Sequence, residues 1–352
     1  MRARTFLLGA LALLTAVGAT PAAAPRDAGP NLDVILADRP AATLGAYGLF
    51  RDPVAREPNA GVVAYDLPIP LFSDYAAKRR YVFMPAGTRA QYRDEGAFEF
   101  PLGTVLIKTF EYPADMRRPD DNVRQIETRL LIRNRTGWVA NTYIWNAEGT
   151  DARLQVAGAS MSVRWTAHDG GAHEITYAAP NRNQCKGCHS VDGAFTPIGP
   201  SAGHFGIVTA GETELARWAR LGLLDGAPTS APVAPVSLDA RARAYLDINC
   251  AHCHNPRGPA NTSGLDLRAT QSEPARWGLR KRPIAAGRAS ADMSFAIDPG
   301  HPERSILLHR MASDDPGVMM PELGRTVVHA EGVELVRAWI AQMDAEGRPR
   351  QN

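Results

Sequence analysis

The sequence predicts an α+β, multi-domain fold, with an antiparallel β-sandwich or barrel-like domain in the N-terminal half and a mostly α-helical domain in the C-terminal half. Three observations lead to this prediction. Residues 59–178 contain short runs rich in β-branched and aromatic residues, separated by Gly, Pro, Asn and Asp. Residues 237–346 contain three candidate helices, the last of which carries an apolar stripe. Between these regions, residues 227–236 (APTSAPVAPV) have the composition of an extended linker.

The composition is that of a folded protein. The chain has 352 residues, of which 45% are hydrophobic and 22% charged, and this excludes intrinsic disorder for the bulk of the chain. Its 39 basic and 37 acidic residues nearly balance, so the charge does not point to nucleic acid or an anionic membrane as a partner. Four cysteines are too few for a disulfide-rich scaffold of this size.

The first 24 residues have the features of a secretory signal peptide. Arg2 and Arg4 form a positive region, residues 6–16 are apolar, and small residues follow through position 24. The apolar stretch is too short to span a bilayer comfortably. We therefore expect cleavage, a periplasmic location and no stable membrane anchor, with residues 25–58 as an N-terminal extension.

Five runs within residues 59–178 have the character of strands. They are Gly103–Tyr112, Glu127–Arg133, Trp138–Trp145, Met161–Thr166 and Glu174–Tyr177. Asp169-Gly170-Gly171 separates the last two runs and favours a hairpin turn, because glycine adopts positive φ without strain. Short strands at such close spacing favour an antiparallel sandwich or barrel over a βαβ sheet.

Four helices are predicted in the second half of the chain. They cover Gly211–Leu221, Ser237–Asn249, Glu303–Ala312 and Ala330–Met343. Ser237 is the expected N-cap of the second helix, which ends at a pair of cysteines. The last helix carries an apolar stripe for packing, formed by Val333, Val336, Trp339, Ile340 and Met343.

All four cysteines fall in two C-x-x-C-H motifs, Cys185-Lys-Gly-Cys188-His189 and Cys250-Ala-His-Cys253-His254. Two thiols at this spacing match the two vinyl groups of a haem, and the adjacent histidine matches its proximal iron ligand. The sequence therefore predicts two covalently bound haem c groups, held by residues 179–226 and 237–346. Zinc binding and redox or structural disulfides are the alternatives. Neither requires the trailing histidine, and a thioredoxin-like C-x-x-C expects a βαβ context that is missing here.

Met320 is the predicted second axial ligand of the haem at His254. It lies in Val318-Met-Met-Pro-Glu-Leu-Gly324, just before a proline and ahead of the last predicted helix. A methionine thioether is a common axial ligand in electron-transfer cytochromes. Met319 is the rival, and Met311 lies on a predicted helix. Core packing is the alternative role for each methionine.

The interval between His189 and the linker contains no methionine. His204 is its only histidine, and it is a candidate ligand of the first iron as well as an ordinary loop histidine. An open, five-coordinate iron is also compatible with the sequence. The carbonyl of Pro197 or Pro200 is the expected acceptor for the outer nitrogen of His189. Other donors would come from the β region: Met84, Met116, Met161, His168 or His173.

Six phrases carry a resemblance to known proteins. They are Asp66–Asp74 (DLPIPLFSD), Phe100–Phe110 (FPLGTVLIKTF), Asn183–His189, Pro197–Pro200 (PIGP), Asn249–Gly258 and Met320-Pro321. Together they resemble a family of secreted bacterial dihaem c-type cytochromes, whose members join a β-rich N-terminal half to a cytochrome-c-like C-terminal half. The resemblance covers residues 59–343 and implies haem binding and electron transfer, with both C-x-x-C-H motifs as attachment sites. Where related chains often have Arg-Asn-Leu-Asn after PIGP, this chain has His204-Phe-Gly.

The sequence thus predicts a periplasmic dihaem c-type cytochrome that transfers electrons between redox partners. Its C-terminal domain is expected to be cytochrome c-like, and its β domain to be a docking platform or scaffold. An electron-transfer protein is preferred to a stand-alone enzyme. The alternative is a haem-dependent oxidoreductase with an open first haem or a substrate-binding β domain. The redox partner protein is not identified by the sequence.

Overall fold

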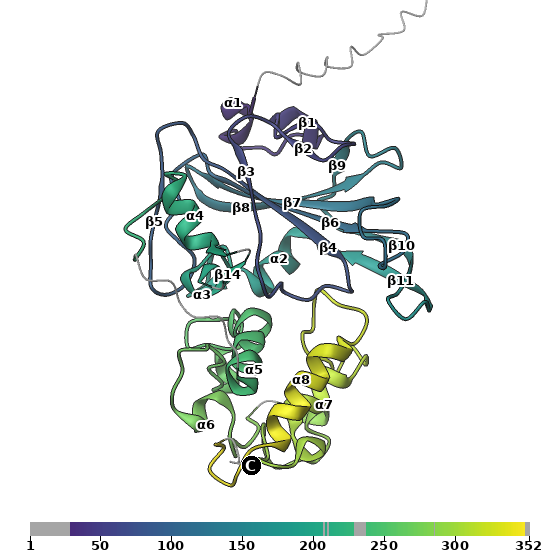
Figure 1. Cartoon of the computed structure of the whole chain (residues 1–352), viewed down its shortest axis with the longest axis vertical. Coiled ribbons are helices and arrows are strands. Elements are labelled where there is room, and N and C mark those ends of the chain that lie inside the picture. The colour runs from purple at the N-terminus through teal and green to yellow at the C-terminus, as the bar shows by residue number, and fades with distance from the viewer. Residues whose placement is uncertain (1–28, 207, 210, 229–236, 285, 349–352) are drawn as a thin grey trace, which may run out of the picture.

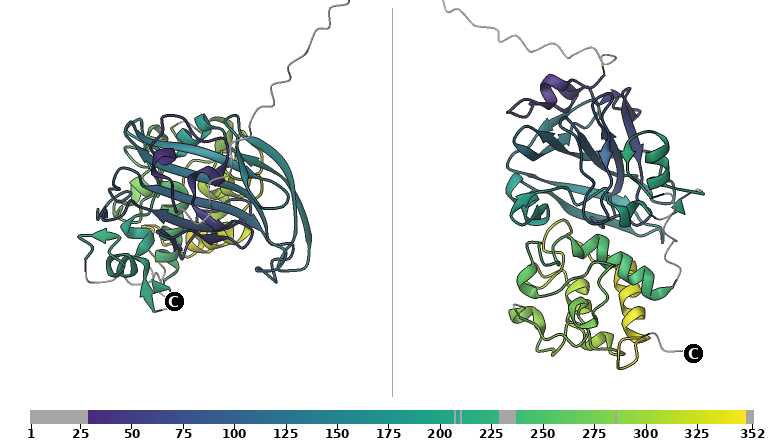
Figure 2. Two further views of the ribbon diagram at one scale, coloured as in Figure 1. Left: turned by 90° about the horizontal axis from the view of Figure 1, so that it is seen from above. Right: turned by 90° about the vertical axis from the view of Figure 1, so that its left-hand side faces the viewer.

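A computed structural model describes residues 29–206, 208–209, 211–228, 237–284 and 286–348. The predicted signal peptide and residues 229–236 of the predicted linker lie outside the described residues. The β-rich part of the chain and the part after residue 237 lie one above the other in Figure 1, and the side view in Figure 2 shows the same arrangement. Among the described residues, no helix combines the length and apolar character needed to cross a bilayer.

A six-stranded antiparallel sheet forms the centre of the β-rich part, in the order β3-β4-β6-β7-β8-β9. Its strands are β3 (Val62–Tyr65), β4 (Ala77–Phe83), β6 (Val105–Tyr112), β7 (Arg124–Asn134), β8 (Gly137–Trp145) and β9 (Ala152–Leu154). The predicted strands 103–112, 127–133 and 138–145 are confirmed as β6, β7 and β8. Gly137, at φ 129°, permits the tight turn between β7 and β8.

Both faces of the sheet are covered by other segments. Ile35, Leu44 and Tyr47 pack beside Tyr81 and Ile107 in one apolar cluster. They come from α1 (Leu32–Ile35) and a 3-10 turn (Leu44–Tyr47), which β1 (Phe50–Asp52) and β2 (Glu57–Pro58) follow. Residues 29–58, predicted as an extension, therefore contribute to the core.

The opposite face of the sheet carries a second cluster. Val82 and Leu106 alternate along their strands with Tyr81 and Ile107, so they point to the other side. They pack with the buried ring of Trp218. This ring comes from α4 (Glu214–Arg220), which follows α2 (Arg182–Cys188) and α3 (Ala202–Phe205).

The remaining strands form small ladders and one hairpin. The pairs are β5 (Ala90–Gln91) with β16 (Leu224–Asp225), β12 (Ser190–Val191) with β13 (Ala194–Phe195), β14 (Val208–Thr209) with β15 (Glu212–Thr213), and β10 (Ala159–Thr166) with β11 (Ala172–Ala179). The β10–β11 hairpin confirms the predicted turn, where Gly170 has φ 88°. Its Trp165 and Tyr177 pack against Phe110 and Tyr112 of β6.

Among the described residues after position 237, four segments are α-helical. They are α5 (Leu238–Leu246), α6 (Pro274–Trp277), α7 (Ile306–Ala312) and α8 (Ala330–Ala341). The predicted helices are confirmed as α4, α5, α7 and α8, each within narrower bounds. The Ser237 hydroxyl caps α5 by accepting the N–H of Ala240 at 3.1 Å. The predicted stripe of α8 is buried, with Val336, Trp339 and Ile340 at its centre.

The predicted fold class is nevertheless wrong. The chain is β-rich, with 27% strand against 24% helix, and the described residues contain no large helical cytochrome-like domain. Between residues 252 and 305 the only α-helix among the described residues is the four-residue α6. Pro256, Gly258 and Pro259 follow the second motif directly. Proline removes a backbone donor and glycine costs backbone entropy, so this stretch cannot continue as a helix.

The β-rich part also differs from the predicted sandwich or barrel. Strands β3 and β9 are the two edges of the sheet and do not pair with each other, so the sheet stays open. Helices and the N-terminal segment, rather than a second large sheet, cover it. Alternation along a strand reports which residues face a core, but it does not report what supplies the other side of that core.

Residues 72–75 join the β-rich part to the C-terminal part, and we refer to them as the clasp. The Phe72 N–H donates to Oδ1 of Asn249 at 2.8 Å. The Phe72 ring stacks on His329, with ring centroids 4.1 Å apart. The Tyr75 hydroxyl donates to the Glu331 carboxylate at 2.8 Å.

Asp74 is the buried centre of the clasp. Its carboxylate accepts the N–H groups of Thr326 at 2.6 Å and Val327 at 3.0 Å. Its own carbonyl accepts the hydroxyl of Tyr112 at 2.7 Å. One residue therefore connects the sheet to the loop that precedes α8.

Asp74→Ala should lower the free energy of unfolding by about 2–4 kcal/mol, because two buried N–H groups lose their acceptor and alanine tolerates the positive φ of this residue poorly. Asp74→Asn keeps one acceptor and accepts positive φ, so it should lose less. Chemical denaturation measures both changes.

The control for this experiment is Asp120→Ala, which removes a carboxylate that is 86% exposed. It should change the free energy of unfolding by less than about 0.5 kcal/mol. Equal losses in the Asp74→Ala and Asp120→Ala variants would contradict a structural role for the clasp.

Candidate functional site

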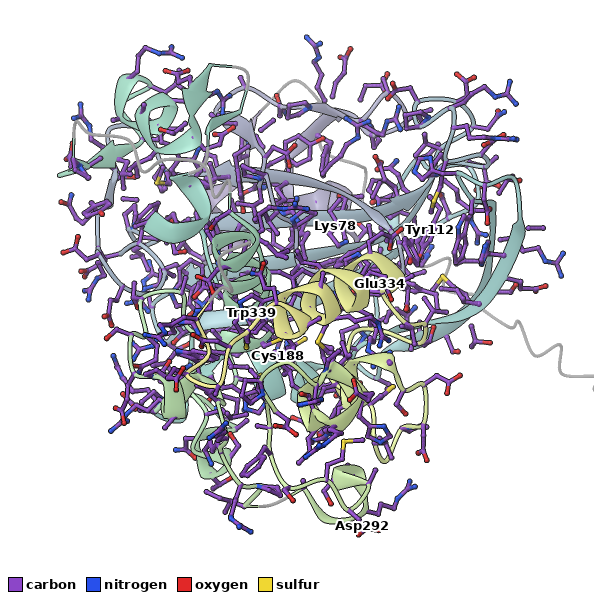
Figure 3. All side chains as sticks on the ribbon, turned by 60° about the horizontal axis from the view of Figure 1, so that its bottom comes forward. Lys78, Tyr112, Cys188, Asp292, Glu334 and Trp339 are labelled. Atoms are coloured by element: carbon purple, nitrogen blue, oxygen red, sulfur yellow. The ribbon has the colours of Figure 1, made fainter. Side chains whose placement is uncertain are left out.

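A cavity of about 630 Å³ lies between the sheet and the C-terminal part of the chain. All six cysteines and histidines of the two C-x-x-C-H motifs line it, together with sheet residues such as Leu106 and Lys108. Its volume falls within the range of small-molecule sites in proteins, roughly 300–1,000 Å³. Figure 3 shows Cys188 near the middle of the molecule, in contrast to the peripheral Asp292. Segments that are distant in sequence therefore meet at one site.

The first motif occupies α2 and the residue after it. The Asn181 side chain accepts the N–H of Gln184, and the Gln184 side chain accepts the N–H of Asn181, so a capping box begins the helix. Cys185 is buried, and the helix ends at Cys188. His189 then leaves the helix, and its ring stacks on Phe195 with centroids 5.4 Å apart.

The second motif follows α5 through a π-helical turn, Asp247–Ala251, which contains Cys250. The Asn249 side chain spans this turn, because its Nδ2 donates to the carbonyl of Tyr245 at 3.0 Å while its Oδ1 accepts the Phe72 N–H from the clasp. The clasp thus contacts the residue directly before Cys250.

Both motif histidines are held in one tautomer. Nδ1 of His189 lies 3.2 Å from the Thr196 carbonyl, which only accepts, so this nitrogen carries the proton. The acceptor is thus Thr196, not Pro197 or Pro200 as predicted. Nδ1 of His254 lies 2.9 Å from the Ser263 hydroxyl.

The Ser263 hydroxyl donates its own proton to the Ala260 carbonyl at 2.7 Å, so it accepts from Nδ1 of His254. Removal from water lowers the pKa of His189 to about 3 and that of His254 to about 4. Both rings are neutral at pH 7, with the lone pair on Nε2. This is the state that a histidine metal ligand requires.

The cavity distinguishes the candidate methionines. Met320 and Met311 line it, whereas Met319 is buried outside its lining. The Met320 loop is held by the buried guanidinium of Arg325, which donates to the carbonyls of Met320 and Ser313 at 2.9 and 2.8 Å. The structure therefore favours Met320 over its neighbour as the residue presented to the cavity.

His204 is buried on α3 and also lines the cavity. Its Nε2 lies 3.7 Å from a carboxylate oxygen of Asp247, at the beginning of the π-helical turn. The other proposed donors of the β region are not part of the cavity lining: Met84, Met116, Met161, His168 and His173. His173 instead stacks on Trp165, with centroids 5.4 Å apart.

Three cations on the sheet were missed by the sequence analysis. Arg80, Lys108 and Arg129 occupy neighbouring register positions on β4, β6 and β7, and all three line the cavity. Arg129 pairs with Glu127 through Nη2 at 2.9 Å. In the described part of the chain, Lys108 has no ion pair and lies over the Phe110 ring at 5.0 Å. Charged residues inside otherwise apolar strands were the signal that could have revealed this cationic row.

The four cysteines do not form the disulfides that were considered as an alternative. All four are free thiols. Among the described residues, the one cluster with metal-ligand spacing combines Cys188, His252 and Cys253. It takes one cysteine from each motif and offers three ligands, fewer than the four of a structural zinc site. His252, to which the sequence analysis assigned no role, lies in this cluster.

The surroundings of the thiols separate their pKa values. Desolvation raises the pKa of Cys185 and raises that of Cys250 to about 12. A hydrogen bond from the Cys253 thiol lowers the pKa of Cys188 below its usual range, and a hydrogen bond with His252 lowers it further. The same hydrogen bond between Cys188 and Cys253 raises the pKa of Cys253. In the chain without a bound group, Cys188 is therefore the thiolate.

No protein-family profile, curated protein or solved structure matches this chain. Kinship with the secreted dihaem cytochromes therefore stays a prediction.

In reduced, haem-free chain, iodoacetamide should modify Cys188 first, because alkylation requires a thiolate. The rate at Cys188 should change less than about tenfold between pH 6 and pH 8, since a lowered pKa leaves the thiolate already formed at pH 6. An ordinary thiol would accelerate by nearly a hundredfold, roughly tenfold per pH unit. Peptide mass spectrometry over time measures each cysteine, and a rise at Cys188 as steep as that of an ordinary thiol would contradict this assignment.

Proposed function

We propose that this chain is a periplasmic dihaem c-type cytochrome that transfers electrons between redox partners. The observation that carries the proposal is that both C-x-x-C-H motifs reach one cavity, each with its histidine held in the tautomer that leaves Nε2 free. Each motif offers two thiols and a neutral imidazole in the order that covalent haem attachment uses. The predicted signal peptide supports delivery to the periplasm.

The residues present fit this cofactor. Cys185 and Cys188 would hold one haem and Cys250 and Cys253 the other, with His189 and His254 as proximal ligands. Bound haem supplies one-electron redox chemistry. The Thr196 carbonyl accepts a hydrogen bond from Nδ1–H of His189, and the Ser263 hydroxyl accepts one from Nδ1–H of His254. Each hydrogen bond fixes the orientation of the ring and increases the basicity of its Nε2.

The distal candidates differ in how they are held. Met320 lies on a loop whose carbonyls are fixed by Arg325 and whose next residues are fixed by Asp74. A thioether in such a position raises the potential of an iron site relative to a second histidine. His204 is buried and lines the cavity, and the Asp247 carboxylate lies 3.7 Å from its Nε2. We propose Met320 as ligand at the second site and keep His204 as the candidate at the first.

The cationic row gives a further reason to expect an anionic cofactor. Arg80, Lys108 and Arg129 are neighbours in register, and like charges in such positions repel one another. Haem carries carboxylate groups, and a bound carboxylate would relieve this repulsion and accept charge-assisted hydrogen bonds. The positive charge near His189 would also favour the reduced state of an iron there.

The proposal is tested by haem content. Chain exported through its own signal peptide in a host that matures c-type cytochromes should carry two covalent haems, measured by pyridine haemochrome and intact mass. Cys188→Ala and Cys253→Ala should each lose covalent haem at one site alone. His301→Ala, at an exposed histidine outside the motifs, is the control and should keep both haems. Absence of covalent haem, or stoichiometric zinc in its place, would overturn the proposal.

Met320→Ala should abolish the far-red charge-transfer band of Fe(III)–thioether ligation. It should also lower the potential of that haem by about 60 mV or more, a tenfold change in the one-electron equilibrium, because a soft ligand that favours Fe(II) is lost. Absorption spectra and redox titration measure the two effects. Met319→Ala is the matched control, since it changes the adjacent methionine outside the cavity. A band lost only in Met319→Ala would transfer the assignment to that residue, and a band kept in both variants would remove this loop from the site.

A further inference from the structure

The second cysteines of the two motifs lie side by side. The Sγ atoms of Cys188 and Cys253 and a ring nitrogen of His252 are all within 4.8 Å of one another. The Sγ atom of Cys253 also lies 3.6 Å from the carbonyl oxygen of Gly187, inside the other motif. Residues 188 and 253 are far apart in the sequence, so this proximity is a product of the tertiary structure.

The segments after the two motifs hold this contact in place. Asp192 and Arg257 each lie four residues after the second cysteine of their motif. The Asp192 N–H donates to the Arg257 carbonyl at 2.9 Å. The Arg257 guanidinium donates to the Asp192 carboxylate through Nε at 2.7 Å. Two connections, one through the backbone and one through the side chains, thus join the two attachment segments.

The space around the contact is shared. Both motifs line the same cavity, and His252 is part of that lining. Nδ1 of His252 is buried and has no hydrogen-bond partner. The two attachment sites are therefore not separated by a wall of packed side chains.

We infer that the two haems form a close, electronically coupled pair, joined to the chain at the neighbouring sulfurs of Cys188 and Cys253. This inference rests on the proposed function. In covalently attached haem, one carbon of the former vinyl group would link each sulfur to its porphyrin, so sulfurs within 4.8 Å of each other would bring the two porphyrin edges close together. An electron that enters at one iron would then move to the other within the protein, leaving the first iron oxidised and the second reduced.

Coupling also has an electrostatic consequence. Reduction of one iron removes a unit of positive charge, which makes reduction of a nearby second iron less favourable. At an effective dielectric constant near 20, the charge on one iron changes the reduction equilibrium constant of a second iron on the order of 10 Å away by about tenfold or more. The two haems should therefore titrate as a pair and not as two independent sites.

The experiment uses full-length protein with two covalent haems. Circular dichroism in the Soret region should show a bisignate couplet, which two porphyrins in close contact produce and isolated porphyrins do not. Two double variants each keep one haem. The first, Cys185→Ser with Cys188→Ser, should keep only the second haem, and the other, Cys250→Ser with Cys253→Ser, should keep only the first haem. Each single-haem variant should lose the couplet, and its remaining haem should be harder to reduce than the first reduction step of wild type by about tenfold or more in equilibrium constant, because the positive charge of the oxidised partner haem is missing.

A measurement on the wild type alone keeps the test independent of how the variants fold. Electron paramagnetic resonance should show magnetic interaction between the irons in the fully oxidised protein, and the interaction should vanish in the half-reduced protein. Two covalent haems with additive Soret spectra and no magnetic interaction would overturn the close pair while leaving the proposed function intact. Absence of covalent haem would overturn the proposed function itself.

Discussion

The site depends on one interaction, the buried contact of the Asp74 carboxylate with the Thr326 and Val327 N–H groups. The Tyr112 hydroxyl holds Asp74 to the sheet. Arg325 directly precedes Thr326, and its guanidinium donates hydrogen bonds to the carbonyls of Ser313 and Met320. The sheet, the clasp and the Met320 loop are therefore parts of one hydrogen-bonded series. Because the cavity lies between the sheet and the C-terminal part, its shape depends on these hydrogen bonds staying intact. Buried charge-assisted hydrogen bonds suit this purpose, since an unpaired carboxylate at the same place would be costly.

Electrostatics adds a second constraint, which acts on the sheet side of the cavity. Arg80, Lys108 and Arg129 would repel one another less if they were exposed, yet they face a cavity that removes water from them. Burial lowers the pKa of Lys108 well below its usual value, and its basic neighbours lower it further. Glu127 already pairs with Arg129, and the Asp66 carboxylate lies 3.5 Å from Arg80, so Lys108 is the member of the row that an anion in the cavity would stabilise most. The stability of the chain and its affinity for an anionic cofactor are therefore coupled, because any group that binds the folded state alone stabilises it.

The sequence predicted the local features well and the long-range ones poorly. Strands β6 to β8, the β10–β11 hairpin and the α8 stripe were predicted correctly, because each is encoded by periodicity or turn residues within a dozen positions. The fold class was wrong, because Pro256 to Pro259 stop the helical pattern after the second motif and because covering segments are not encoded in strand alternation. At the site, the motif residues and Met320 could be named from spacing. The Thr196 and Ser263 acceptors, the cationic row and the Cys188–Cys253 contact arise from tertiary packing, which spacing does not contain.

The difference between local and long-range features explains how a haem site can be predicted from sequence while the surrounding domain is not. Covalent attachment needs two thiols and a histidine within five consecutive residues, and both a short helix such as α2 and a π-helical turn such as Asp247–Ala251 present them. The chemistry therefore depends on a local segment that different folds can carry. The fold determines how the two motif segments lie relative to each other. The clasp is hydrogen-bonded to Asn249, directly before the second motif, and the Asp192–Arg257 ion pair joins the residues that follow the two motifs. In this chain the β-rich part supplies one wall of the cavity and its positive charge, so it is a component of the redox site that we propose and not only a scaffold beside it.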